Sequence, residues 1–418
     1  MLERCRGLRC WVVAICAVLA SATTCGDQPA GSGFLALVGG TLIDGSGAEP
    51  VPDATIVIRA ERILYAGPAD AIELPTAAAV LDVHGRTVLP GFINSHVHGA
   101  LSVPRLEAWA WAGVTTVRDL GCSPAALAPF RAANPPDPLR ARLVAAGPLI
   151  TVSGGYPIVP FGGGWTTTIS SEEEARTVAE DILDGGADLL KLALETGTVF
   201  GLTIPVMSPQ QAAMLVRVAH GRGTLASAHV TSVVDLELAL SSGVDEIAHM
   251  VVDREIPDSL LQQVVAADIR WVPTLELWQC AGLEAMAVHN LGRFLAAGGT
   301  VALGTDYQGY ACSWDGGMPM TEIELMTEAG MTAMEIIVAA TRNAAGACNL
   351  ERDLGTVGKG MVADLIVLDQ DPLEDLHALE QVRLVIHDGT VIRNELPTWQ
   401  GPSPRRPTRR VRPGSGGP

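Results

Sequence analysis

Two histidines that follow directly on an apolar segment have a spacing suited to binding a metal ion. His96 and His98 come just after residues 89–94 of this chain. In an extended strand, residues two positions apart point to the same face, so both imidazoles would project together. Imidazole nitrogen is a common ligand of zinc and related ions. A lone His-x-His pair is often incidental, so further ligands are needed to give it meaning.

Three more side chains with ligand chemistry stand at corresponding places later in the chain. His229, His249 and Asp306 each follow a short apolar run. The carboxyl ends of parallel barrel strands meet at one face, which is where such folds hold their active sites. A single histidine at the end of a strand is usually structural. Several at the same topological level, with a carboxylate, suit Zn²⁺ or a related ion.

Lys191 lies inside the apolar segment 188–193 and is one of only two lysines, beside 26 arginines. A buried ammonium without a partner costs several kcal/mol. One interpretation is that Lys191 extends to the rim or pairs with a distant acid. The other is that its neutral amine adds carbon dioxide, and the resulting carbamate bridges two metal ions as a carboxylate would.

The elements that must position these residues have an α/β rhythm. From about residue 88, apolar strands alternate with amphipathic helices, for example over 171–184, 208–220 and 231–240, each opened by a Ser or Thr suited to N-capping. Eight candidate strands predict a (β/α)₈ TIM barrel over residues 91–348: 91–94, 114–117, 143–146, 188–193, 224–228, 246–248, 270–274 and 300–304.

Short β-prone runs at both ends of the chain predict a second domain. They occupy residues 34–90 and return after Asn349, over 363–368 and 383–386. We expect the two sets to pair as a composite β-sandwich built from residues 34–90 and 349–395. Residues 396–418 are rich in Pro, Gly and Arg, which is typical of a disordered tail.

The start of the chain is typical of an export signal. Three arginines precede the apolar stretch 11–19 and the small residues 20–22, which predicts a signal peptide over residues 1–22. Residues 23–33 would be a flexible linker or a tether lipidated at Cys25, although Thr24 fits the lipidation pattern poorly. The expected location is therefore periplasmic, secreted or lipid-anchored at the cell envelope.

Composition excludes some partners. The net charge is −18, and loss of residues 1–22, with three arginines and one glutamate, would make it −20. An acidic protein is a poor ligand for nucleic acid. We expect a small-molecule substrate, membrane contact only through Cys25, and leave a homo-oligomer open. No disulfide framework is expected from the four scattered cysteines outside the signal region, Cys122, Cys280, Cys312 and Cys348.

The ordered set His96, His98, Lys191, His229, His249 and Asp306 resembles the binuclear, lysine-carbamate branch of the amidohydrolase superfamily. The resemblance runs from about residue 35 to 394 and includes segments 88–93, 113–119 and 358–365. Within the superfamily, the chain looks most like the imidazolonepropionase-related prolidase and Xaa-dipeptidase group. That resemblance implies two divalent ions, with zinc expected. His96, His98 and Asp306 would hold the inner ion, His229 and His249 the outer one, and carbamylated Lys191 would bridge them.

The resemblance also implies a reaction. A metal-bridging hydroxide would attack an amide-like C–N bond in a peptide, an N-acyl amino acid or a cyclic amide. Asp306 would accept the proton of the hydroxide and pass it to the leaving nitrogen.

One loop departs from the peptidase pattern. Those enzymes tend to carry a histidine after a Gly-Gly pair in the third βα loop, where this chain has Tyr156. Tyr156 could donate to a substrate and Trp165 could form an apolar wall, or both could be packing residues. Arg118 could bind a substrate carboxylate or form a structural ion pair.

Three alternative functions remain open. A lactonase or phosphotriesterase-like esterase could use the same ions. A one-metal deaminase would need a glutamate soon after His229 and no carbamate lysine, but residues 230–233 are Val-Thr-Ser-Val. A non-enzymatic metal or solute binder would not require Asp306 together with Lys191.

Overall fold

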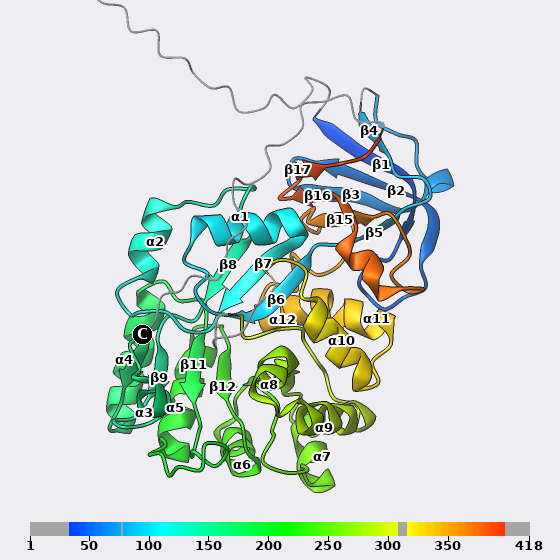
Figure 1. Cartoon of the computed structure of the whole chain (residues 1–418). Helices are drawn as coiled ribbons and strands as arrows, with labels where there is room; N and C mark the ends of the chain where they lie inside the picture. The colour runs from blue at the N-terminus through cyan, green and yellow to red at the C-terminus, as the bar shows by residue number, and fades with distance from the viewer. Residues whose placement is uncertain (1–32, 77, 308–315, 398–418) are drawn as a thin grey trace, which may run out of the picture.

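The computed structural model describes residues 33–76, 78–307 and 316–397. Figure 1 shows a β-rich part and a larger body of strands and helices, and the first and last described strands both belong to the β-rich part. The predicted signal peptide, Cys25, Cys312 and nearly all of the predicted tail lie outside these ranges. None of the described helices is long and apolar enough to cross a membrane.

The β-rich part is one sheet built from both ends of the chain. Strand β5 (Thr87–Pro90) pairs antiparallel with β15 (Leu365–Leu368), which joins the two ends. The strands are recorded as one sheet in the order β17-β16-β15-β5-β1-β2-β3, with β4 on β1, so the two-layer packing of a sandwich stays a prediction. The other strands are β1 (Phe34–Leu42), β2 (Val51–Arg59), β3 (Arg62–Pro68), β4 (Ala79–Asp82), β16 (Val382–His387) and β17 (Thr390–Asn394).

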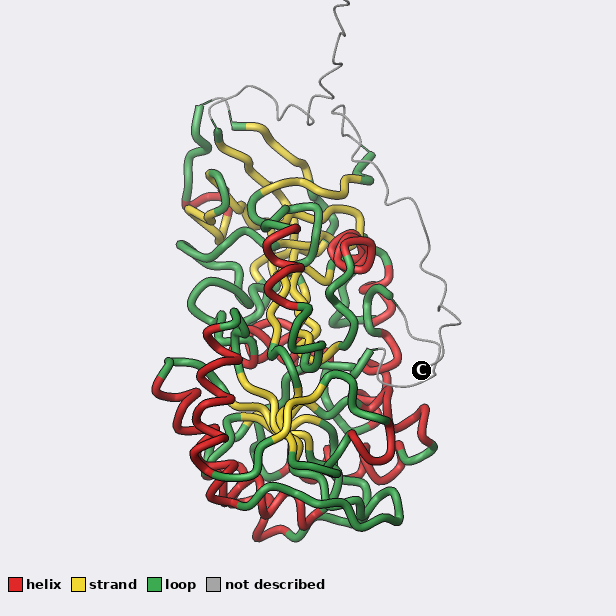
Figure 2. The backbone as a smooth tube through the Cα atoms, turned by 90° about the vertical axis from the view of Figure 1, so that its left-hand side faces the viewer, coloured by secondary structure: helices red, strands yellow, loops and turns green. Residues whose placement is uncertain are grey.

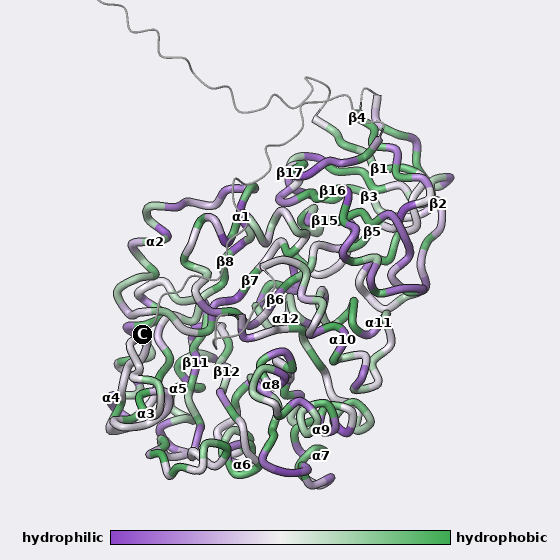
Figure 3. Tube along the Cα trace, viewed as in Figure 1, coloured by the Kyte–Doolittle hydropathy of each residue, from purple (hydrophilic) through white to green (hydrophobic). Residues whose placement is uncertain are grey.

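Apolar residues of this sheet form a core of their own. Leu37, Ile56, Val88, Leu365 and Ile386 are all fully buried and belong to one cluster. Figure 3 shows hydrophobic stretches along β15 and β16. Burial of these strands explains why their sequences are almost continuously apolar.

The body contains two parallel sheets, β6-β7-β8 and β10-β9-β11-β12-β13-β14. Figure 2 shows the strands of the body gathered at its centre and the helices at its periphery. The fold is therefore α/β with parallel pairing, as the sequence predicted. The strands are β6 (Phe92–Val97), β7 (Val114–Asp119), β8 (Arg142–Ala145), β9 (Leu149–Thr151), β10 (Thr166–Thr168), β11 (Leu190–Ala193), β12 (Ala226–His229), β13 (Glu246–Ala248) and β14 (Arg270–Val272).

The eighth predicted strand, over residues 300–304, is only an isolated bridge, Val301 to Trp271. Backbone hydrogen bonds still connect this segment to β14 and β6. The Ala302 amide donates to Trp271 O in β14, and the Ser95 amide in β6 donates to Leu303 O, each at 2.9 Å. Because the segment soon leaves the extended conformation, it is too short to be assigned as a strand. A closed ring is not recorded, and full barrel closure stays a prediction.

Of the three helices named from the sequence, two begin at the indicated residues, Ser171 and Ser208, and the third is capped by Ser232 instead of Thr231. The side chains of Ser171, Ser208 and Ser232 accept from backbone amides at the starts of α4, α5 and α6. The described helices are α1 (Val103–Ala112), α2 (Leu127–Ala133), α3 (Ile158–Phe161), α4 (Glu172–Asp184), α5 (Pro209–Gly221), α6 (Val233–Ser242), α7 (Asp258–Ala266), α8 (Leu275–Ala281), α9 (Glu284–Ala296), α10 (Met320–Glu328), α11 (Ala333–Val338) and α12 (Ala344–Ala347), with a π-helical turn (Ala339–Asn343) and two 3₁₀ turns (Ala69–Ala71, Leu376–Glu380).

The described cysteines differ in their bonding. Cys122 and Cys348 are free and buried. Cys280, at the end of α8, is disulfide-bonded, and its partner lies outside the described residues. The sequence indicated no framework of disulfides and did not identify this single bond, because pairing depends on proximity in space that scattered spacing along the chain does not indicate.

Candidate metal centre

The predicted metal ligands lie together at the carboxyl ends of the body's strands. Nε2 of His96 and Nε2 of His98 are each 3.0 Å from Oδ1 of Asp306. The ring of His249 lies 4.8 Å from that of His96 and 4.5 Å from that of His229, between centroids. His249 therefore lies between the group of His96, His98 and Asp306 on one side and His229 on the other.

Several polar atoms of this cluster are buried without a hydrogen bond. They are both ring nitrogens of His96, Nε2 of His229 and Oδ1 of Asp306. Such atoms are costly unless something satisfies them. Two ligands bound about 2.1 Å from one ion lie roughly 3 Å apart, which matches the separation of His96 and Asp306. Ligand atoms of His96, His249 and Asp306 all lie within 4.8 Å of one another. These residues therefore fit a divalent ion.

Two of the ligands have an unusual backbone. His249 has a φ of 70° and Asp306 a φ of 61°, in the left-handed region that side chains other than glycine rarely adopt. Each stands just past a strand segment, where the change of direction turns the side chain toward the cluster. Strained backbone of this kind concentrates at functional sites.

Burial and neighbouring charge set the protonation of the cluster. Burial lowers the pKa of His96 to about 3. Burial alone would raise the pKa of Asp306, but His96 and His98 hold it well below its ordinary value. Neutral imidazole and ionised carboxylate are the forms that bind metals, so both residues are in the binding form at neutral pH.

Lys191 is buried in β11 and lies within electrostatic reach of the cluster. Its side chain is 2% exposed, its Nζ donates to Oγ of Ser227 at 3.4 Å, and it forms no ion pair within the described part of the chain. Burial lowers its pKa to about 7, against the opposing charge of Glu246. A substantial fraction of Lys191 is therefore a neutral amine at neutral pH, and its charge influences the pKa values of His96, His229 and His249.

Arg118 forms a buried structural ion pair and does not face a substrate. It is fully buried, and its guanidinium donates to Oε1 of Glu246 at 2.5 Å and to the carbonyls of Ser95 and Ala347. A substrate carboxylate could not reach it. The suggestion that Arg118 binds substrate is corrected on this ground, since its position at the end of β7 directs it into the interior.

The two aromatic residues predicted at the rim lie beside histidines of the cluster. The ring of Tyr156 stacks on that of His229, with centroids 4.0 Å apart and planes inclined by 22°. Trp165 adjoins Gly121: a Cβ on that glycine would lie 3.2 Å from Cδ1 of Trp165 and 3.1 Å from Cε1 of His98. Their contact with substrate stays a prediction.

Two residues that contact the ligands were not found from the sequence. Glu195 is buried, and its Oε2 lies 3.5 Å from Nε2 of His229. Oγ1 of Thr274 lies 2.9 Å from Nδ1 of His249. Glu195 follows β11 as His229 ends β12, so the strand-end rule applied to the ligands would also have found it. Side chains behind metal ligands commonly fix their orientation.

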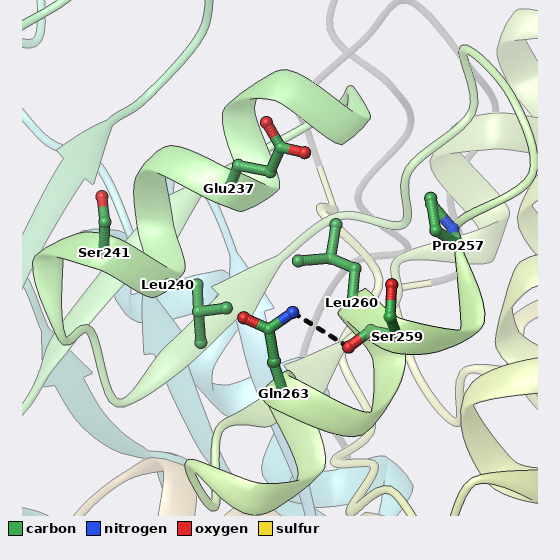
Figure 4. Close-up of a pocket in the computed structure, with 7 residues that line it drawn as sticks. All are labelled: Glu237, Leu240, Ser241, Pro257, Ser259, Leu260 and Gln263. Carbon is green, nitrogen blue, oxygen red and sulfur yellow. Dashed lines mark hydrogen bonds between the residues drawn. The ribbon is translucent and has the colours of Figure 1, made fainter.

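Two other clusters are separate from this centre. Asp364, His387 and Asp388 also lie close together, but Arg142 already pairs with both carboxylates, 2.7 Å from that of Asp364, which ties β8 to the β-rich part. A hollow between α6 and α7 contains none of the predicted site residues (Figure 4). It is lined by Glu237, Leu240, Ser241, Pro257, Ser259, Leu260 and Gln263.

Comparison with known proteins supplies independent information. A model of the amidohydrolase family matches residues 87–392. Ochratoxinase of Aspergillus niger is 26% identical over an alignment covering 83% of this chain and 84% of the relative. Imidazolonepropionase of Streptomyces griseus is 26% identical, covering 76% and 86%. The crystal structure of a putative prolidase from Bifidobacterium longum superimposes with a TM-score of 0.72 at 27% identity, covering 89% of this chain and 96% of that one.

Proposed function

Because this chain belongs to the amidohydrolase family, we propose that it is a metal-dependent hydrolase that cleaves an amide-like C–N bond of a small molecule. The chain is an enzyme acting on carbon–nitrogen bonds, as its relatives named for ochratoxin and imidazolonepropionate hydrolysis and its prolidase neighbour indicate. The observation that carries the finer proposal is the cluster of buried ligand atoms that lack hydrogen-bond partners.

The proposal includes a closed barrel around this cluster. Backbone hydrogen bonds from Ser95 to Leu303 and from Ala302 to Trp271 support a segment lying between β14 and β6. A further bond, from the amide of Asp188 to Ala145 O at 2.8 Å, supports the junction of the two recorded sheets. Closure would direct every strand-end ligand to one mouth.

The ligand assignment follows the grouping of the side chains. His96, His98 and Asp306 would hold one divalent ion, and His229 and His249 the other. When bound, two such ions lower the pKa of a shared water to about 7 and polarise the carbonyl of the substrate. Asp306 would hold the proton taken from that water and deliver it to the leaving nitrogen, since its carboxylate faces both inner histidines.

Lys191 would complete the site as a carbamate. Its neutral Nζ would form a bond to the carbon of carbon dioxide and release a proton to solvent, which leaves a carboxylate-like group on the side chain. Deep burial without an ion pair among the described residues supports this role, because a permanent ammonium would be costly there.

We also propose that the enzyme works outside the cytoplasm. The arginine-rich start of the chain motivates this proposal. The disulfide at Cys280 supports it, since disulfides persist in oxidising compartments.

A hydrolysis screen tests the proposed function. The protein would be depleted with a chelator, reloaded with Zn²⁺, Co²⁺ or Mn²⁺, and given dipeptides, N-acyl amino acids, lactones and aryl phosphates. We expect metal-restored cleavage of amides, lost in His249→Asn and kept in His289→Asn, an exposed histidine paired with Glu255. Faster cleavage of lactones or phosphates would favour the esterase, and ammonia release from amidines the deaminase.

A further inference from the structure

We propose that aromatic side chains beside the histidine cluster form walls for a flat apolar group, so the substrates are amides that carry an aryl or similarly bulky apolar group. The inference rests on the proposed function and names its substrate class. It is carried by three aromatic rings on one side of the cluster, a fourth on the other side, and the exposure of apolar side chains around them.

The first wall adjoins His229. Tyr156 stacks on that histidine, with 4.0 Å between ring centroids. Phe200 lies parallel to Tyr156 at 5.9 Å, and Phe161 meets both rings edge-on, at 6.0 and 5.9 Å. These are the separations at which aromatic pairs attract one another. The three rings therefore form a continuous apolar surface that begins at a metal-binding side chain.

This surface is not fully covered by the rest of the protein. Phe161 is 42% exposed, and Val159 and Leu202, which lie two residues from Phe161 and Phe200 respectively in the sequence, are each 43% exposed. Single exposed apolar residues are ordinary, but these gather on the loops after β9 and β11. Those loops follow the carboxyl ends of barrel strands, where substrates bind. An apolar group of a substrate would remove this surface from water.

The second wall stands on the other side of the cluster. Trp165 is 36% exposed, and its Cδ1 lies close to the backbone of Gly121, which also adjoins the ring of His98. A Cβ at Gly121 would lie 3.1 Å from the ring of His98 and 3.2 Å from Trp165, so a larger residue there would press on both rings. His98 and His229 thus each have an aromatic neighbour, and an amide held between the histidines would present its substituents to these rings.

The burial of Arg118 also supports an apolar substrate group. Arg118, the strand-end cation that could have selected a substrate carboxylate, is fully buried and paired with Glu246. Apolar or aromatic side chains are exposed on the loops beside the cluster, at Phe161, Val159, Leu202 and Trp165. We therefore expect substrate preference to follow the size and flatness of an apolar group more than the presence of a free zwitterion.

Two matched substrate pairs test the inference. N-benzoylglycine and N-acetylglycine differ only in the acyl group, and N-acetylphenylalanine and N-acetylalanine differ only on the amine side. We expect kcat/KM to favour the aromatic member at least about tenfold in one pair or the other. Phe161→Ala or Trp165→Ala should reduce that ratio about threefold or more, the order of one lost aromatic contact. The ratio cancels any general loss of folding or metal.

Leu64→Ala is the matched control, because Leu64 is 40% exposed but lies in β3 of the other part. Its ratio should equal that of the wild type. Two results would overturn the inference and leave amide hydrolysis unaffected. In the first, the kcat/KM ratio of aromatic to non-aromatic substrate stays within about twofold of unity for both pairs. In the second, Phe161→Ala and Trp165→Ala leave that ratio unchanged.

Binding separates this inference from the proposed function. If no amide is hydrolysed, calorimetric titration can still measure the affinity of the protein for benzamide and acetamide, and so test the aromatic walls. Tighter binding of benzamide that Phe161→Ala weakens would support the aromatic walls and count against amide hydrolysis. Equal binding of the two amides, or no binding of benzamide, would overturn the walls.

Discussion

At His229, the choice of ring nitrogen decides how the residue can bind an ion. Its Nε2 faces Oε2 of Glu195 at 3.5 Å. The same carboxylate accepts from Oγ1 of Thr231 at 2.5 Å and from the Gly197 amide at 2.6 Å, so it is held firmly in place. That Nε2 is buried without a hydrogen bond, so it is the nitrogen left to bind an ion, and the fixed carboxylate beside it holds the orientation of the imidazole. Glu195 is therefore a positioning residue for His229.

Replacement of Glu195 should weaken metal retention more than folding. In Glu195→Gln, we expect metal affinity to fall about 10- to 100-fold, the usual effect of removing such a partner. Competition with a chelator would measure it, and kcat should fall while KM stays near that of the wild type. Asp253→Asn is the control, since Asp253 caps α6 at the Val233 amide and has no contact with the ligands. Equal metal affinity in both variants would make Glu195 structural only.

At the level of single residues, the sequence predicted positions better than roles. The histidines and Asp306 could be found because each follows an apolar strand, and all strands end at one face. Arg118 was ambiguous because a strand-end cation can point inward or outward, and only packing decides. Glu195 was not predicted because it stands two residues beyond the apolar segment 188–193, and the sequence does not show that its side chain approaches His229.

Among the elements, α8 and α10 meet through a buried carboxyl close to the site. Oε2 of Glu322, on α10, accepts from the Glu276 amide at the start of α8 at 2.8 Å, while its Oε1 is buried without a hydrogen bond. Burial raises the pKa of Glu322 to about 8. The carboxyl is therefore protonated in the folded protein at neutral pH, whereas it would be ionised in the unfolded chain.

This shift makes stability depend on pH in a definite direction. Between about pH 4.5 and 8, the folded protein binds a proton that the unfolded chain releases, so Glu322 makes the protein less stable as pH rises. Glu322→Gln should remove that slope. Its Tm relative to wild type should rise between pH 5.5 and 8.5, by about 2 °C or more. Thermal unfolding at the two pH values checks this, and a constant difference would mean that Glu322 is not protonated.

Seven of the eight strands predicted for the body match observed strands, β9 and β10 were not predicted, and the loss of the eighth strand has a physical cause. The predicted segment 114–117 lies within β7, and 246–248 coincides with β13. The eighth segment is reduced to a bridge because it ends at Gly304, where a Cβ would lie 2.8 Å from the backbone of His96, and then turns at Asp306. Periodicity indicates which residues are apolar but not how closely two backbones approach.

At the scale of the whole molecule, the chain returns to its starting sheet after it has built the α/β body. The pairing of β5 with β15 makes the β-rich part depend on both ends, and Arg142 links that part to β8 through Asp364 and Asp388. The sequence predicted this composite part because β-prone runs flank the α/β rhythm. It could not predict the pairing order, which depends on contacts between segments far apart in the chain.

Export is a prediction about the whole molecule that no contact within it tests. We expect the mature protein to begin after Ala22, because the arginine-rich start and the small residues 20–22 match a cleavable signal. Intact mass and N-terminal sequencing of the protein from its native host would measure this. A mass increase of diacylglycerol size at Cys25 would establish the anchored form instead. An unprocessed chain in the cytoplasm would contradict export.

The most direct test of the two-ion account is the metal content and hydrolysis rate of Lys191→Arg beside wild type. Arginine is always protonated and cannot form a carbamate, but its side chain is similarly long. Wild type should contain two equivalents of divalent metal by elemental analysis. Lys191→Arg should fold, lose metal from both positions and lose at least about 100-fold in rate, and Lys191→Ala should regain activity with short carboxylic acids. Two equivalents of metal and a wild-type rate in Lys191→Arg would contradict the account.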